Sequence, residues 1–154
     1  MGLFKGGSRS EALADKLREG IEPAIAGEEL KGACLSTQAG MTKGRMVAIG
    51  VTEHHLVLQP MTRKWQPDGP AILLAPGQIA SASANGSGGL GSRLTSLLMD
   101  DAQITLRLKT IDGQSWKLMM MSGSGLFGGL GGGETQKQGV EALAAWFAAA
   151  DEGN

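Results

Sequence analysis

Cysteine, histidine and long apolar runs are scarce in this sequence of 154 residues. Cys34 is the single cysteine, which excludes an internal disulfide, fits a reducing compartment and predicts a small buried thiol. The longest apolar run, residues 142–150, is far shorter than the roughly 18 residues that a membrane-spanning helix needs. The first residues lack the apolar core of a signal peptide. We therefore expect a cytoplasmic protein without a transmembrane helix.

The sequence also has little net charge. Lys and Arg number 14 against 15 Asp and Glu, which gives a formal charge of -1 at pH 7. Such a balance produces no overall field toward nucleic acid or anionic lipid. We expect no nucleic-acid partner, and any charged site must be local.

A recognisable set of catalytic or metal-binding residues is missing as well. His54 and His55 are adjacent, so on a strand they point to opposite faces and cannot hold one metal ion. We interpret them as part of a solvated turn, and the adjacent acids at 28–29 and 100–101 as loop charges. No Gly-x-Ser-x-Gly elbow joins a strand to a helix. We expect no metal, no cofactor and no enzymatic activity.

The clearest pattern that is present is an alternating hairpin. Apolar residues recur at every second position in residues 104–109 and again in residues 116–120, as in strands with one buried and one wet face. Asp112-Gly113 lies between the two segments and suits a tight turn. A glycine-rich loop, residues 122–133, follows the hairpin.

Five further short strands are predicted upstream of this hairpin. Each is a short apolar or alternating segment bounded by turn residues, and they cover residues 30–37, 45–51, 56–60, 71–74 and 78–84. Strands do not alternate with helices, so the sheet should be antiparallel. The expected fold class is therefore mainly β with α (α+β), a seven-stranded antiparallel barrel or sandwich.

Two helices are expected at the ends of the chain. Residues 8–11, Ser-Arg-Ser-Glu, match a capping box and open a short N-terminal helix that should pack on the flank of the domain. Residues 135–138, Thr-Gln-Lys-Gln, match a second capping box. The C-terminal helix should run to about residue 149 and lie on the sheet with one apolar face, which carries Val140, Leu143, Ala144 and Phe147.

Three stretches carry a resemblance to a known family. They are residues 47–58 (VAIGVTEHHLVL), residues 63–69 (RKWQPDG), and the run from Lys117 through GLFGGLGGGE to Trp146. These resemble bacterial, specifically actinobacterial, pleckstrin-homology-like proteins of uncharacterised function. The resemblance implies a seven-stranded barrel capped by a C-terminal helix, with residues 1–27 as leader and helix, 28–150 as the domain and 151–154 as a tail. It also implies a non-catalytic binding or assembly module, although the fold does not fix the ligand.

The preferred functional prediction is protein–protein interaction or self-association. Arg63, Lys64 and Trp65 place cations beside an aromatic ring on an expected loop, a composition typical of a partner-binding surface. Met119 and Met121 belong to a methionine run that puts apolar side chains on both faces of the last strand, so a loop or another subunit should cover one face. The resemblance adds that bacterial relatives are often oligomeric.

The alternative prediction is a module that binds a membrane headgroup or a small anion. Lys43 and Arg45 match the basic residues that flank the loop between the first two strands in pleckstrin-homology domains that bind phosphoinositides. Gly133 and Thr135 lie at the expected start of the C-terminal helix, where free backbone amides can hold an anion. Glu134 between them opposes an anionic ligand.

Overall fold

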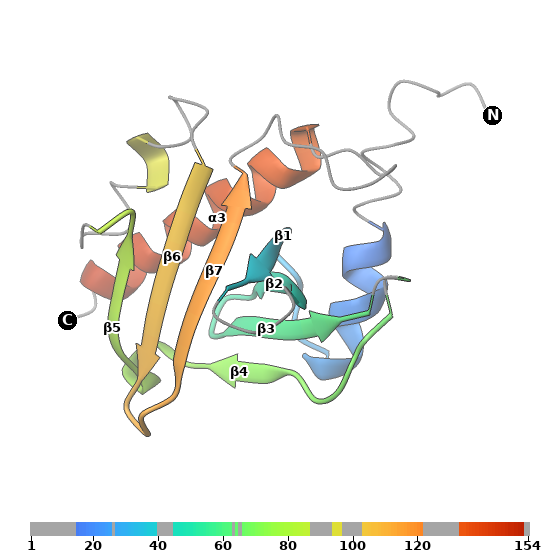
Figure 1. The fold of residues 1–154 in the computed structure, drawn as a ribbon, viewed down its shortest axis with the longest axis horizontal. Helices are drawn as coiled ribbons and strands as arrows, with labels where there is room; N and C mark the ends of the chain where they lie inside the picture. The colour runs from blue at the N-terminus through green and yellow to red at the C-terminus, as the bar shows by residue number, and fades with distance from the viewer. Residues whose placement is uncertain are drawn as a thin grey trace.

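The computed structural model describes residues 15–25, 27–39, 45–62, 64, 66–86, 94–96, 103–121 and 133–152, of which 121, 133–135, 151 and 152 are described as backbone only. These residues form a seven-stranded antiparallel sheet, rolled into a nearly closed barrel, with a C-terminal helix and a short N-terminal helix (Figure 1). The expected α+β class and the strand count are confirmed. The strands are β1 (Gly32–Gln38), β2 (Arg45–Val51), β3 (Leu56–Met61), β4 (Ile72–Leu74), β5 (Ile79–Ala84), β6 (Gln103–Thr110) and β7 (Ser115–Met121).

The strand order is β4-β3-β2-β1-β7-β6-β5, so two antiparallel meanders meet where β1 pairs with β7. β1 pairs with β2 along its whole length but with β7 only at Thr37 and Gln38. The two strands therefore separate over the first half of β1, and this opening is the seam of the barrel. At the other side β4 and β5 are the edge strands, linked by the short 3-10 helix η3 (Pro76–Gln78).

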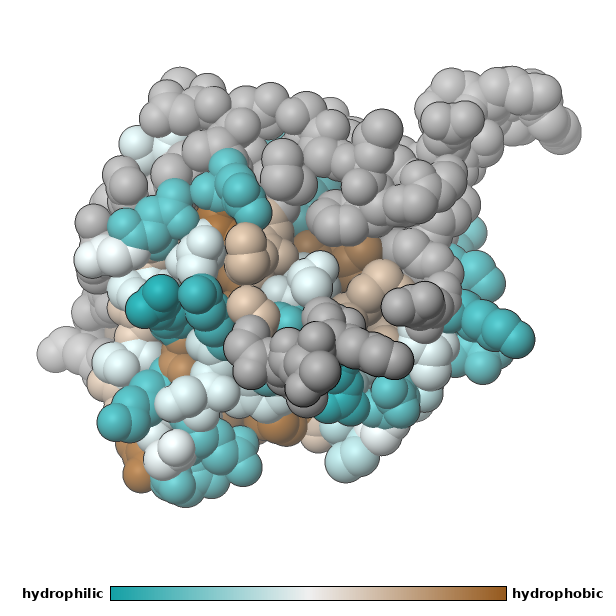
Figure 2. Space-filling model, in the orientation of Figure 1, coloured by the Kyte–Doolittle hydropathy of each residue, from teal (hydrophilic) through white to brown (hydrophobic). Residues whose placement is uncertain are grey.

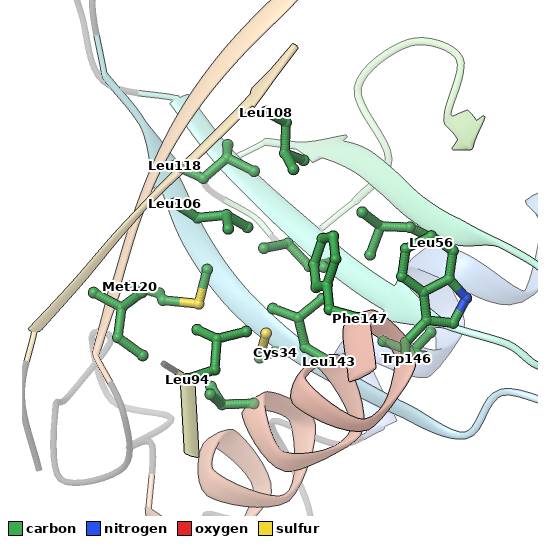
Figure 3. Packing of buried hydrophobic residues seen from close by; sticks show 14 of the residues in the cluster. Cys34, Leu56, Leu94, Leu106, Leu108, Leu118, Met120, Leu143, Trp146 and Phe147 are labelled. Carbon is green, nitrogen blue, oxygen red and sulfur yellow. The ribbon is translucent and has the colours of Figure 1, made fainter. Parts of the chain in front are cut away.

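The barrel interior is packed against the C-terminal helix α3 (Gly133–Glu152), which crosses behind β6 and β7 in Figure 1. In Figure 3, Leu143 and Phe147 of this helix face Leu106 of β6. Trp146 also belongs to this core, and its ring meets the ring of Phe147 edge to face with centroids 5.1 Å apart. The predicted apolar face of α3 is confirmed.

A second apolar layer covers the outside of β1–β3. The helix over residues 15–21 and the 3-10 helix η2 (Glu22–Ala24) run along this outer face. Three side chains from this segment and four from the strands form the layer: Leu17, Ile21, Ile25, Leu35, Ala48, Val57 and Met61. The expected packing of the N-terminal helix on the domain is confirmed. Because β3 is buried on both faces, its apolar residues Leu56–Leu58 are consecutive and do not alternate with polar ones.

Most predicted boundaries differ from the structure by a few residues, and two of the differences have a clear physical reason. Strand β3 continues through Pro60 to Met61. The Pro60 carbonyl accepts a hydrogen bond from the Asp68 amide on the side of β3 where β4 has already ended. The N–H that proline lacks would point to this same side, so its absence costs no hydrogen bond to a neighbouring strand. The prediction that residues 135–138 form a capping box at the start of the C-terminal helix is wrong. Helix α3 begins at Gly133, so Thr135 already lies inside it and Gln138 is exposed. The capping box at residues 8–11 and residues 122–132 of the glycine-rich loop lie outside the described residues.

Gln136 has a different role, because its side chain fills the seam. Its Oε1 accepts a hydrogen bond from the Leu35 amide at 2.9 Å, and its Nε2 donates to the Leu35 carbonyl at 3.0 Å. Both backbone groups point to the side of β1 that β7 does not reach. The amide side chain is fully buried, so it replaces a neighbouring strand at this position.

The helix can approach β1 this closely because the contact positions are glycines. A Cβ atom on Gly139 would lie 2.0 Å from the carbonyl oxygen of Ala33, and one on Gly32 would lie 2.6 Å from the Cβ of Ala142. Real Cβ atoms essentially never approach other heavy atoms so closely. Gly139 and Gly32 therefore set the distance between α3 and β1.

We expect the variant Gly139→Ala to lower the free energy of unfolding by about 2–3 kcal/mol, because the methyl group drives α3 away from β1. The change should be destabilising even though alanine is the better helix former by about 1 kcal/mol. Urea denaturation followed by circular dichroism measures the effect. The control is Ala145→Gly on the exposed side of the same helix, which should cost only about 1 kcal/mol. A Gly139→Ala protein as stable as the parent contradicts the close contact.

We expect Gln136→Met, which keeps the length of the side chain, to lower the free energy of unfolding by about 2–4 kcal/mol. The reason is that the N–H and C=O of Leu35 lose their partner in a buried place. The matched control is Gln138→Met, two positions along the same helix, where the side chain is exposed. Equal stability of the two variants would show that the amide clamp is dispensable.

Candidate functional site

The outer surface of β5, β6 and β7 carries a group of cations and hydroxyls. Their register aligns Ser83, Arg107 and Lys117 in one row across the three strands, and Ser81, Lys109 and Ser115 in the next row. These residues alternate with the apolar residues that face α3, so they point away from the core. We call these six residues the basic face. Figure 2 views the molecule from this side and shows hydrophilic teal and white atoms over these strands.

The cations of the basic face form no ion pair with any other described residue. Arg107 lies directly opposite Lys117, and like charges in this relation destabilise a sheet. Ion pairs hold Arg18, Lys31 and Arg45, whereas exposed lysines such as Lys137 resemble the basic face in having none within the described residues. What distinguishes the basic face is therefore the direct opposition of two cations, and an anionic ligand would relieve their repulsion.

An open hollow of about 630 Å³ crosses this surface. Its lining includes all six residues of the basic face and, among the described residues, no carboxylate. Gln38 and Trp116 complete part of the wall, and each has a buried polar atom, Oε1 and Nε1 respectively, without a hydrogen-bond partner in the described structure. Such orphaned polar atoms are uncommon in native proteins unless water or a ligand reaches them. The hollow is thus lined by cations and hydroxyls together with apolar residues such as Ala82 and Leu108.

Apolar atoms adjoin the cations at one end of this surface. Met119 lies two residues beyond Lys117 on the same face of β7, opposite Thr105 of β6 and Thr37 of β1. It is half-buried. Of the two methionines predicted to bind a partner, Met119 therefore borders the basic face, whereas Met121 is described only as the backbone partner of Gln103.

The predicted loop site is described only at Lys64, which is exposed and whose amide donates to the Thr62 hydroxyl at 3.2 Å. Arg63 and Trp65 lie outside the described residues. The structure therefore places one of the three predicted side chains on the surface.

The predicted anion site is only partly described. Arg45 donates to the carbonyl of Asp68 at 3.1 Å and lies 3.9 Å from its carboxylate, so its charge is already engaged. Gly133 and Thr135 are backbone positions in the first turn of α3. Lys43 lies outside the described residues.

A polar cluster joins the segment before β1 to the turn between β2 and β3. The Thr52 hydroxyl donates to Glu28 Oε1 at 2.8 Å, and His55 Nδ1 lies 2.8 Å from Glu28 Oε2. The hydrogen bond from Thr52 has the largest effect and lowers the pKa of Glu28. Desolvation opposes it, and the hydrogen bond and charge of His55 lower the pKa further, so the net shift is downward. Glu28 and His55 are thus structural partners, whereas Glu29 and His54 are exposed, as expected of loop charges and a solvated turn.

Among the described residues, no hydrogen bond joins the hydroxyl or thiol of one residue to a histidine ring. The Thr52 hydroxyl donates to Glu28 Oε1 and, at 3.3 Å, to the His55 carbonyl, while the His55 ring contacts Glu28, so the imidazole is not placed to activate Thr52 as a nucleophile. Burial raises the pKa of the Cys34 thiol to about 12, which keeps it protonated and confirms the expected buried thiol. Within the described ranges, no group of three or more His, Cys, Asp or Glu side chains is placed to hold a metal ion. None of the described helices is long and apolar enough to span a membrane.

Comparison with protein-family models gives no match, and comparison with curated proteins gives none either. Among solved structures, the chain is similar to the C-terminal domain of an unknown protein from Leishmania infantum. The sequence identity is 16%, the TM-score is 0.49, and the match covers 89% of this chain and 97% of that chain. A likeness at this level says nothing about function, so the function must be argued from the geometry of the chain itself.

Sequence reasoning did not single out the basic face. The signal was present, because Arg107 and Lys109 occupy the wet positions of an alternating strand and Lys117 occupies one in the return strand. What was missing was the register, which decides that Arg107 lies opposite Lys117 and that Lys109 lies between two serines. None of the three cations stands out in a sequence of balanced charge.

The Glu28 cluster generates a prediction about acid stability. The pKa of the Glu28 carboxyl is lowered from the ordinary value of 4.5, so ionised Glu28 stabilises the fold above that pH. This contribution to the free energy of unfolding is lost as the pH falls through the lowered pKa. Glu28→Gln should therefore be less stable than the parent at neutral pH, and the difference should shrink on acidification. Urea titrations at about pH 7, 4.5 and 3 test this expectation.

The control for this prediction is Glu29→Gln. The Glu29 side chain is 82% exposed and only 3.8 Å from Lys31, an arrangement that contributes little. A Glu28→Gln protein whose stability follows that of the parent at all three pH values would show that the cluster does not stabilise the fold through ionised Glu28.

Proposed function

We propose that this protein is a non-catalytic binding module of pleckstrin-homology-like architecture that recognises another protein through the basic face. The strand order of two meanders joined through β1 and β7, with a C-terminal helix on the barrel, supports the proposed architecture. The resemblance to actinobacterial proteins of this type supports it further. A lone, buried and unpaired Cys34 is compatible with a cytoplasmic location, which is part of the proposal.

The observation that carries this proposal is the gathering around one hollow of three cations that form no ion pair with any other described residue. Arg107, Lys109 and Lys117 lie on neighbouring strands, whereas the chain as a whole has a charge of -1. A local cationic surface on a nearly neutral protein selects a partner with a local acidic segment rather than any polyanion at a distance. Electrostatic complementarity of this kind sets specificity and association rate.

A protein partner is favoured over a small anion because the surface is mixed. Serine hydroxyls flank the cations, and Met119 adds an apolar contact at one end. Protein interfaces combine apolar, hydroxyl and arginine contacts in this way, and methionine and arginine are enriched in them. A second copy of this chain, or a lipid headgroup, is the competing occupant.

The proposal rests also on the chemistry of the remaining polar groups. The hydroxyl of Thr52, the imidazole of His55 and the carboxylate of Glu28 are engaged in holding a turn. The thiol of Cys34 is buried and protonated. A binding role therefore requires fewer assumptions than a catalytic one.

The test is the binding of poly-L-glutamate, as an acidic polypeptide probe, to the full chain at low and at high salt. We expect saturable, salt-sensitive binding that the double variant Arg107→Glu/Lys117→Glu weakens by about tenfold or more. The matched control is Lys137→Glu, which reverses an exposed lysine of α3 and should leave binding unchanged. Isothermal titration calorimetry measures binding, and circular dichroism verifies that each variant is folded.

Two companion measurements identify the competing occupants. Vesicles containing phosphatidylserine that bind more tightly than poly-L-glutamate would replace the protein partner with a membrane surface. A solution mass that doubles with concentration in the parent but not in the double variant would replace it with a second copy. Equal binding of poly-L-glutamate by the parent and the double variant would overturn the proposed role of the basic face.

A further inference from the structure

The row formed by Ser83, Arg107 and Lys117 is the most highly charged part of the basic face. We infer that the group it holds is a phosphate ester, carried as phosphoserine or phosphothreonine on an extended segment of the partner. This inference rests on the proposed function, because it requires a protein partner on the basic face. It adds the chemical identity of the partner's anionic group.

Charge is the first reason for a phosphate. Side chains directly opposite each other in an antiparallel pair have Cβ atoms about 4.5–5.5 Å apart, so one anion can contact both Arg107 and Lys117. A carboxylate brings a single negative charge and leaves one of the two cations unbalanced. A phosphate monoester carries about -1.5 to -2 at pH 7 and balances both.

The number and kind of donors is the second reason. A phosphate ester presents three strong acceptor oxygens. The guanidinium of Arg107 offers a planar fork that matches two of them, and the ammonium of Lys117 can donate to a third. The Ser83 hydroxyl stands on the other side of Arg107 and supplies a further donor in the same row. A carboxylate has two oxygens, so it would leave part of this set unused.

The next row indicates that the phosphate belongs to a peptide. Ser81, Lys109 and Ser115 form a row two residues along the strands, a step of about 7 Å, in which a single cation lies between two hydroxyls. In an extended peptide, side chains on one face recur with this same step. A second acidic residue, two positions from the phosphorylated one, would therefore reach Lys109.

The row on the opposite side contains one large apolar side chain. Met119 and Thr105 lie two residues from Lys117 and Arg107, respectively, in the direction away from Lys109. An extended segment lying along β6 and β7 thus meets Lys109, then the phosphate-binding row, then Met119 in succession. A free phosphate ion would use only the middle row, which favours a peptide as the ligand.

The test uses three peptides that differ only in the central residue X of Glu-Gly-X-Gly-Glu, with X as serine, glutamate or phosphoserine. The sequence is symmetric, so either direction along β6 presents an acid to Lys109. Binding to the full chain is followed by ¹⁵N NMR, with the amides of Arg107 and Lys117 and the indole N–H of Trp116 as local reporters. We expect the phosphoserine peptide to bind about tenfold more tightly than the glutamate peptide, and the serine peptide to bind most weakly.

Two variants of one position separate charge from geometry. Arg107→Lys keeps the charge but removes the planar fork, so the preference for phosphoserine over glutamate should fall while the glutamate peptide still binds. Arg107→Glu should abolish binding of both peptides. Lys137→Glu is again the matched control and should bind all three peptides as the parent does.

The outcomes distinguish the two proposals. Equal affinity for the glutamate and phosphoserine peptides overturns the phosphate inference and leaves the acidic-partner proposal standing. Poly-L-glutamate binding without any binding of the phosphoserine peptide does the same. Inorganic phosphate or inositol trisphosphate that binds as tightly as the phosphoserine peptide overturns the peptide as the source of the phosphate. Loss of binding to poly-L-glutamate as well as to every peptide overturns both proposals.

Discussion

The close packing of α3 on β1 is the constraint on which the rest of the structure depends. The barrel is open along the first half of β1, and the two hydrogen bonds between Gln136 and Leu35 satisfy the backbone groups that this opening would otherwise leave buried and unpaired. Gly139 gives the helix the space to come that near. The apolar face of α3 then covers the barrel interior, so the position of the core follows from the seam.

The two halves of the sheet differ in how many faces they bury, and this difference explains where a surface site can exist. The half that contains β1–β3 has α3 and the barrel interior on one side and the N-terminal helix on the other. The half that contains β5–β7 keeps an outward face whose cations are exposed. A partner can therefore reach side chains on a regular, rigid sheet surface, which holds their spacing more firmly than a loop does.

Local patterns in the sequence predicted the elements well, and interactions between distant segments account for what they missed. The hairpin around Asp112-Gly113 was predictable because one of its faces is wet, which leaves a clear alternation. The partner of Gln136 was not predictable, because its hydrogen bonds join residues 101 positions apart. Nothing in the sequence around a glutamine indicates which distant backbone groups its side chain will bind. The pairing of Glu28 with His55 is likewise set by how two segments meet. Arg107 and Lys117 were visible as separate wet positions, but only the strand register makes them neighbours.

The distance along the chain between Leu35 and Gln136 also affects the order of events during synthesis on the ribosome. The first strand of the sheet emerges early, and the residue that satisfies its exposed edge is made 101 residues later. Until then the nascent barrel has an unpaired strand edge and an uncovered apolar interior, the two features that make a chain prone to misassociation. Synthesis of helix α3 is thus the step that allows the fold to close, and a nascent chain stalled before Gln136 would present that open edge to the chaperones around it.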